Sequence, residues 1–377
     1  MSPLVAVAGG TGNLGRTIVE GIIADAKFEV VILARKIVTV DYTSVEALTR
    51  VLEDNKVHTV ISVLNTMGDG AEPELHLITA ADRAATTKRY IPSIWGGKYT
   101  EELATHFPIA KDKLEAIAIV FKVDWFTGYF ADYYVAPHIK TYMTILHAVV
   151  DVTNNRATIP GSGDMPVAFT HTLDIAKLVA ASLTLPKWEP ETYMIGDKLT
   201  FNDLVALAER VKGVKFKVTY DSVHALKAGT VSELPSHPEI YPFFPKDRVQ
   251  GLLATSGLMF EDGIYNLKPK RTIDQAFPEL KVRNMKALME EAWKGNVGEV
   301  ACMMVLHRQP PQGKMSPQDT LIIRTALQIC CRISRSSILA LPPQIQRQRG
   351  RKKNKEDEQK EPDEYTQDHP NIIFHHQ

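Results

Sequence analysis

Short apolar runs alternate with segments of helical periodicity along the first 130 residues of the chain. The runs are almost continuously apolar, which is typical of strands whose two faces are both covered. We predict strands over residues 3–8, 28–35, 37–42, 58–65, 89–96 and 123–130. We predict helices over residues 16–26, 43–55, 71–85 and 109–120. This alternation favours an α/β fold with a doubly wound parallel sheet of the Rossmann type.

The second half of the chain predicts a smaller α+β lobe. Residues 159–163 have the composition of a turn, and residues 170–183 have the periodicity of an amphipathic helix. Thr200 and Asp203 stand at the spacing of a capping box, which opens a helix that ends at Gly213. We therefore divide the chain into a first domain over residues 1–150, a smaller lobe over residues 151–300 and a tail over residues 301–377.

The composition changes near residue 300. The chain carries 44 basic and 44 acidic side chains, but residues 301–377 hold 12 basic and 8 acidic ones, against 32 and 36 before them. All three cysteines also lie beyond residue 300. Residues 347–364 are highly charged and poor in apolar side chains, which predicts a disordered tail. The segment 349–355 is typical of a nuclear-import or nucleic-acid patch, but a solvated tail is the simpler interpretation.

The charge and hydropathy of the whole chain exclude several classes of protein. A net charge of zero gives no basic field over the whole chain, so we expect no nucleic-acid partner. No apolar run reaches the roughly 18 residues that a membrane span needs. The N-terminus lacks the basic region of a signal peptide. We therefore expect a cytoplasmic protein that does not enter a membrane.

A glycine-rich loop joins the first strand to the first helix. Gly9, Gly12 and Gly15 allow a tight turn, a close approach of the backbone to a pyrophosphate, and close packing of helix on strand. The helix start then faces the phosphates with unpaired N–H groups. We predict that the loop binds a dinucleotide, although a purely structural turn is the alternative. The binding residues are then Gly9, Thr11, Gly12, Asn13, Leu14 and Gly15.

The end of the second strand predicts which dinucleotide binds. A carboxylate there would bind the ribose 2′-hydroxyl of NAD. The chain instead has Arg35 and Lys36, 20 residues after Gly15. Two cations suit a 2′-phosphate, so we favour NADP(H) over NAD, with a solvated strand end as the alternative. The connection from Arg35 to the next predicted strand is unusually short.

Several stretches together resemble one family. They are GGTGNLGRTIVEGII, VVILAR, VTVDY, VISVLN, RYIPSIWG and AKDKLEAIAIVFKVDWFTGYFADYYVAPH. The set is similar to the NmrA-like and isoflavone-reductase-like group of atypical short-chain dehydrogenases, over about residues 3–295. This resemblance implies an NADP-binding Rossmann domain with a smaller C-terminal substrate lobe. Typical short-chain dehydrogenases have a catalytic tyrosine with a lysine four residues later. None of the 12 tyrosines of this chain has such a lysine, as expected for an atypical member.

The resemblance also implies site residues. Lys111 falls where the family has its catalytic lysine, and Lys113 is the second choice; a solvated helix face is the alternative for both. Asn65 ends the predicted fourth strand, and it could reach the adenosine ribose or pyrophosphate or be a simple turn residue. Phe130 or Tyr129 could pack on the nicotinamide or on a ring substrate, or could fill core.

Two functions follow from these expectations. The first is an NADPH-dependent oxidoreductase that transfers hydride to a small, aromatic or otherwise unsaturated metabolite, as plant members of the family do. The second is a non-catalytic regulator that senses NAD(P) and binds a protein partner, as a fungal relative does. The two differ in the need for Lys111, which a sensor would not require.

Overall fold

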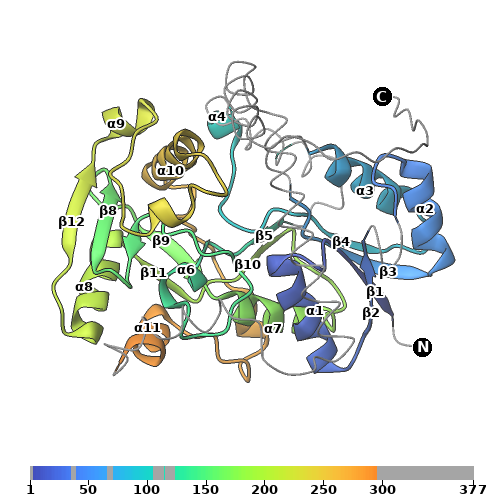
Figure 1. Cartoon of the computed structure of the whole chain (residues 1–377). Coiled ribbons are helices and arrows are strands. Elements are labelled where there is room, and N and C mark those ends of the chain that lie inside the picture. The colour runs from blue at the N-terminus through green and yellow to red at the C-terminus, as the bar shows by residue number, and fades with distance from the viewer. Residues whose placement is uncertain (1–2, 35–39, 66–70, 105–113, 115–123, 295–377) are drawn as a thin grey trace, which may run out of the picture. The chain divides into compact units, whose positions relative to one another are not determined.

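A computed structural model describes residues 3–34, 40–65, 71–104, 114 and 124–294, and these residues lie in one compact unit (Figure 1). Within the described residues, no helix is both long enough and apolar enough to cross a membrane. The predicted tail over residues 301–377 lies outside the described residues.

A parallel sheet forms the first half of the described chain. Its strands are β1 (Leu4–Ala8), β2 (Glu29–Leu33), β3 (Val57–Ser62) and β4 (Arg89–Ile91), in the order β2-β1-β3-β4. All neighbours in this sheet are parallel. A parallel bridge between Gly96 and Phe126 leads on to β5 (Asp124–Phe126), which pairs with β10 (Glu191–Tyr193). This arrangement confirms the predicted doubly wound sheet.

Both faces of this sheet are covered, as its continuous apolar strands predict. Val5 and Val7 of β1 belong to a core with helices α1 (Asn13–Asp25) and α7 (Thr172–Ser182). Ala6 and Ala8 point the other way, into a core with α2 (Val45–Asp54) and α3 (Glu72–Arg83). Successive residues of a strand face opposite sides, so one short run supplies two cores. Figure 1 shows α2 and α3 beside each other next to β3.

Strands and helices mix in the second half of the described chain, as predicted for a smaller α+β lobe. One small sheet has the order β11-β9-β6 and another the order β12-β8-β7. The strands are β6 (Tyr129–Phe130), β7 (Val150–Asp151), β8 (Arg156–Pro160), β9 (Val167–Thr170), β11 (Asp197–Leu199) and β12 (Lys217–Asp221). Besides α4 (Glu101–Ala104), which follows β4, and α7, the α-helices are α6 (Asp132–Val135), α8 (Phe201–Lys212), α9 (Val223–Lys227), α10 (Lys246–Glu261) and α11 (Met285–Trp293). The 3-10 helices are η1 (His237–Glu239) and η2 (Ile273–Ala276).

Local capping signals were sound guides to helix ends. The Ser44 hydroxyl accepts a hydrogen bond from the Ala47 backbone N–H at 3.2 Å and so caps α2. Thr200 and Asp203 form the predicted capping box of α8, and Gly213 ends that helix in the left-handed conformation. Each of these interactions spans only a few residues, which is why the sequence reveals them.

Several predicted strands are shorter than expected or absent. Residues 37–39 of one predicted strand lie outside the described residues, and the prediction is wrong for the rest. Val40 is buried without joining a strand, and the Asp41 carboxylate accepts hydrogen bonds from the Thr43 N–H and hydroxyl, which makes a turn. The predicted strand 89–96 stops at Ile91 because Pro92 has no N–H to donate. The predicted helix 109–120 lies outside the described residues apart from residue 114.

The predicted strand 123–130 is two strands, because its chain turns at Gly128. This residue has φ of +70°, and a Cβ there would lie 2.3 Å from the Ala168 carbonyl oxygen. Only glycine fits such a position. The turn separates β5, which pairs with β10, from β6, which pairs with β9.

The chain returns to the first sheet after its second half has begun. Helix α7 packs on α1, and β10 pairs with β5, although both come after the predicted boundary at about residue 150. The crossing of α1 and α7 is close at Gly21, where a Cβ would lie 2.8 Å from the Ala176 Cβ and 3.0 Å from its carbonyl oxygen. The division at residue 150 stays a prediction.

This crossing predicts opposite effects for two identical substitutions. Gly21→Ala should lower the free energy of unfolding by about 1–2 kcal/mol, because the added methyl forces two packed helices apart. Gly251→Ala, in α10, should raise it by about 0.5–1 kcal/mol, because a Cβ there meets nothing within 4 Å and alanine favours the helix. Urea denaturation of both variants measures the difference, and a stabilised Gly21→Ala protein would contradict the close crossing.

Candidate cofactor site

The glycine turn lies at the point where the strand order reverses. The chain leaves β1 for β2 on one side and later enters β3 on the other side of β1. In open parallel sheets, ligands bind outside the carboxyl ends of the strands at such a point. The turn follows β1 directly and is closed by a hydrogen bond from the Gly12 N–H to the Gly9 carbonyl oxygen at 2.9 Å.

Two of the glycines are required by the geometry of the turn. Gly9 has φ of +74°, and a Cβ there would lie 2.7 Å from the Val63 carbonyl oxygen behind the turn. A Cβ at Gly15 would lie 2.2 Å from the Gly9 carbonyl oxygen. Neither position accepts a side chain without moving backbone. The first turn of α1 is therefore drawn tightly against the end of β1.

The start of α1 is equipped to hold an anion. Gly12 is its N-cap and supplies no side-chain hydrogen bond, and the first turn holds no acidic residue. The first N–H groups of a helix lack partners within the helix, and the helix dipole adds partial positive charge at this end. Thr11, Gly12 and Asn13 are exposed here. A phosphate could therefore reach the backbone N–H groups at this end of α1.

The predicted loop residues divide into two groups. Leu14 is buried, 8% exposed, and packs in the core between the sheet and α1. The exposed Asn13 amide faces a neighbouring segment: with its oxygen and nitrogen placed to suit their partners, it accepts from the Thr144 N–H and hydroxyl and donates to the Tyr142 carbonyl oxygen. Asn13 can therefore serve a ligand through its backbone N–H, and Leu14 anchors the loop by packing.

The segment Lys140–Thr144 is fastened to α1 beside the turn. The Arg16 guanidinium lies 4.1 Å from the centre of the Tyr142 ring. The Tyr142 hydroxyl donates to Glu20 at 2.5 Å, and the Lys140 ammonium lies 2.9 Å from the same carboxylate. Sequence analysis missed this segment, because its partners on α1 lie more than 100 residues earlier. The segment Lys140–Thr144 therefore lies next to the exposed start of α1.

Asn65 and Phe130 also lie at the ends of strands. Asn65 is exposed three residues after β3, and the Val63 N–H donates to the Ala8 carbonyl oxygen at 2.9 Å. Phe130 ends β6, is half-buried and packs against the core that contains Leu14. The first contact places the segment before Asn65 beside the end of β1, and Phe130 borders the core on which α1 packs.

The structure separates the two aromatic candidates of β6. The Tyr129 ring lies 5.1 Å from the rings of Tyr133 and Phe260 and packs in the core of the second half. Burial among these rings raises the pKa of Tyr129 well above its usual range, so its hydroxyl keeps its proton. Tyr129 therefore acts as core, the alternative interpretation, while Phe130 points toward the first sheet.

Four predicted site residues lie outside the described residues. They are Arg35, Lys36, Lys111 and Lys113. Their assignments stay predictions.

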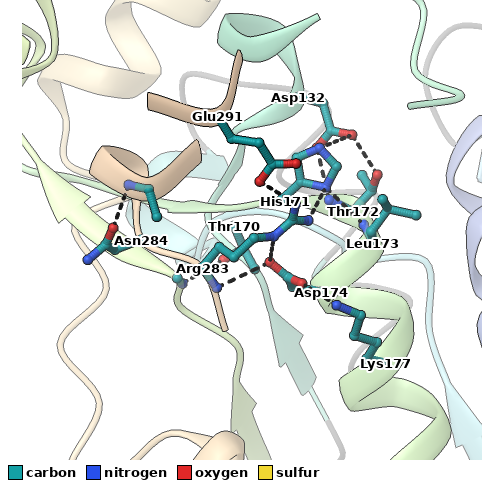
Figure 2. A network of polar contacts seen from close by, with 12 residues as sticks. Asp132, Thr170, His171, Thr172, Leu173, Asp174, Lys177, Arg283, Asn284 and Glu291 are labelled. Atoms are coloured by element: carbon teal, nitrogen blue, oxygen red, sulfur yellow. Dashed lines mark hydrogen bonds and ion pairs between the residues drawn. The ribbon is translucent and has the colours of Figure 1, made fainter. Parts of the chain in front are cut away.

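A buried polar network, which sequence analysis missed, begins two residues after Phe130 (Figure 2). Asp132 and His171 are both fully buried, and the His171 Nε2 lies 3.7 Å from the Asp132 Oδ1. The Asp132 carboxylate accepts from the Thr172 N–H at 2.9 Å, from its hydroxyl at 2.6 Å and from the Thr141 hydroxyl at 2.5 Å. One carboxylate thus joins α6, the start of α7 and the segment Lys140–Thr144.

The surroundings of His171 favour its neutral form. Its Nδ1 caps α7 by accepting from the Leu173 N–H at 3.2 Å, and the Arg283 guanidinium lies 3.4 Å from the same nitrogen. Arg283 also binds the buried Asp174 carboxylate at 3.1 Å. Burial lowers the pKa of His171 below its usual value of 6.5; the nearby Arg283 charge lowers it further, while Asp132 opposes the shift. A proton at Nδ1 would break the helix cap.

A groove of about 520 Å³ lies elsewhere, along α1, α7 and residues 277–280. None of the residues predicted to bind the cofactor lines it. It therefore does not bear on the assignment of the site.

Comparisons with known proteins identify the family. Residues 1–244 match the NmrA-like family, so the chain belongs to that family. Oxidoreductase BOA1 of Botryotinia fuckeliana is 29% identical over 297 residues, which cover 73% of this chain and 95% of that protein.

Solved structures share the fold. Leucoanthocyanidin reductase from Vitis vinifera superposes with a TM-score of 0.56 at 18% identity and covers 76% of this chain and 98% of its own. AtPrR2, solved with NADP⁺ and (+)-pinoresinol, has the same TM-score and identity, and covers 77% and 98%. At this identity the likeness establishes the fold, and it confirms the predicted Rossmann class.

The His171 environment predicts a pH-dependent stability. The folded state holds a neutral imidazole, whereas the unfolded chain takes up a proton near pH 6.5, so stability should fall as the pH drops below 6.5. His171→Asn keeps a side-chain acceptor for the helix cap and should make this fall shallower. His224→Gln, on the exposed face of α9, should leave the pH dependence as it is. Urea denaturation midpoints at pH 5.5 and 7.5 measure this loss of stability. The same change in midpoint between the two pH values in all three proteins would contradict the assignment.

Proposed function

We propose that this protein is an NADPH-dependent oxidoreductase that transfers hydride to a small, aromatic or otherwise unsaturated metabolite. The observation that carries the proposal is the start of α1, which has no side-chain cap and follows a glycine turn at the reversal point of a parallel sheet. Backbone N–H groups there suit the pyrophosphate of a dinucleotide. The name of the fungal relative, an oxidoreductase, supports the same activity.

The preference for NADPH rests on the end of β2. This strand ends at Leu33, and Arg35 and Lys36 follow where an NAD-binding protein would have a carboxylate. Two cations would pair with the 2′-phosphate of NADPH. The NADP⁺ bound to the structural neighbour AtPrR2 supports this choice.

The residues of this chain would divide the reaction between them. When bound, NADPH would supply the hydride that a carbon of the substrate accepts. Phe130 and Trp95, both half-buried against the same core, would offer aromatic surface to a flat substrate. Lys111 would deliver the proton that balances the hydride, to the neighbouring atom of the substrate. The pinoresinol bound to AtPrR2 supports an aromatic substrate.

Nucleotide binding tests the first part of this proposal. NADPH at about 100 times its Kd should raise the melting temperature by about 5 °C, and NADH at the same concentration should raise it less. Gly15→Ala should abolish the shift, because its methyl pushes the Gly9 carbonyl oxygen out of the turn. Gly251→Ala, remote from the turn, should keep it. Differential scanning fluorimetry measures all three proteins, and no shift of the wild type with any nicotinamide nucleotide would refute the proposal.

The lysine assignment has its own test. Lys111→Ala should lower kcat by about 100-fold or more, the usual contribution of a positioned acid, while NADPH still raises the melting temperature. Lys113→Ala should stay near wild-type activity. Steady-state oxidation of NADPH with a panel of unsaturated aromatic substrates measures both. If Lys113→Ala loses activity instead, the roles are exchanged; if the wild type binds NADPH but turns over none of the panel, the sensor alternative is favoured.

A further inference from the structure

A carboxylate is buried beneath the ends of β3 and β4. Glu74 belongs to the first turn of α3, and only 1% of its surface is exposed. It accepts hydrogen bonds from the Tyr90 hydroxyl at 3.1 Å, from the Ser93 backbone N–H at 2.9 Å and from the Ser62 hydroxyl. A buried carboxylate is costly unless donors surround it. These donors therefore satisfy a buried polar side chain where an apolar one would pack at lower cost.

Two of these donors come from segments that leave the sheet. Ser62 is the last residue of β3, and Ser93 follows β4. The segments also bind each other: the Ser93 hydroxyl donates to the Leu64 carbonyl oxygen at 2.7 Å, and the Trp95 indole N–H donates to the Ser62 carbonyl oxygen at 2.8 Å. Glu74 thus anchors two strand ends that are also hydrogen-bonded to each other.

One of these segments forms the back of the glycine turn. The Val63 carbonyl oxygen would lie only 2.7 Å from a Cβ at Gly9, so the backbones of the two segments are in close contact. Asn65, the last described residue of the segment, was predicted to reach the cofactor. Any shift of residues 62–65 therefore moves the wall against which the turn rests.

Tyr90 binds the same carboxylate from a different place. It is the central residue of β4, and its backbone is held by the pairing with β3. Burial and the neighbouring Glu74 charge raise the pKa of Tyr90 well above its usual range, so its phenol stays a donor. Removing this hydroxyl takes away a hydrogen bond of Glu74 without releasing a strand end.

We propose that Glu74 is a positioning residue for the dinucleotide: its buried carboxylate fixes residues 62–65 against the glycine turn, so that the turn keeps the shape that binds the pyrophosphate. The proposal rests on the proposed function, because it needs NADPH as the ligand. Glu74 touches neither substrate nor cofactor in this role.

The test compares NADPH affinity with stability in matched variants. Glu74→Gln keeps the shape of the side chain but puts an NH₂ group toward a donor, and should weaken NADPH binding about tenfold with kcat at saturating NADPH within about twofold of wild type. Ser62→Ala and Tyr90→Phe each remove one neutral donor from the same carboxylate. Both should lower the melting temperature, but Ser62→Ala should also raise the Kd for NADPH about threefold, and Tyr90→Phe should leave it unchanged.

Isothermal titration calorimetry with NADPH gives the Kd, and scanning calorimetry gives the melting temperature. If Glu74→Gln does not fold, the pair Ser62→Ala and Tyr90→Phe carries the test, since both keep the carboxylate. The positioning role is overturned if Ser62→Ala binds NADPH with the Kd of the wild type, or if Tyr90→Phe loses as much affinity as Ser62→Ala. Either result leaves the proposed function intact, provided that the wild type binds NADPH. A wild type that binds no NADPH overturns the proposed function and this role with it.

Discussion

The absence of side chains at Gly9 and Gly15 is the constraint on which the cofactor site depends. With a Cβ at Gly15 only 2.2 Å from the Gly9 carbonyl oxygen, the helix could not start where it does. The close approach brings the first N–H groups of α1 to the reversal point of the sheet. Six residues later, Gly21 allows a second close approach, to Ala176 of α7. Gly15 thus fixes the start of α1 against the turn, and Gly21 fixes the middle of the helix against α7.

Buried carboxylates fix the segments that surround this helix. Glu74 and Asp132 are at most 1% exposed. Each carboxylate accepts one hydrogen bond from a backbone N–H and two from hydroxyl groups. Apolar packing is non-directional, so it would hold these segments near one another without setting their orientation. Hydrogen bonds to a charged acceptor are stronger and directional. The polar anchors therefore lie beneath strand ends and loops, where orientation matters for a ligand.

The sequence predicted what depends on neighbouring residues. The glycine turn and the capping box of Thr200 both involve residues within a few positions of each other. The sequence failed where distant residues decide: Asp132 meets Thr172 across 40 positions, and Arg283 meets Asp174 across 109. Such pairs have no characteristic spacing in the sequence, so they cannot be predicted from it. Residues 40–42 were predicted as strand for a related reason: the apolar pattern suits a strand, but the Asp41 carboxylate offers the backbone a turn instead.

Gly128 stands where the chain passes between two of the cores of the described residues. Its turn leaves β6 only two residues long, and these face opposite ways: Tyr129 enters the aromatic core of the second half, and Phe130 the core beside the glycine turn. Asp132, two residues further on, is bound by Thr141 and Thr172. Phe130 is therefore held on one side by a packed tyrosine and on the other by a buried carboxylate. A ring that bound against Phe130 in the proposed enzyme would therefore meet a side chain whose neighbours in the chain are anchored on both sides.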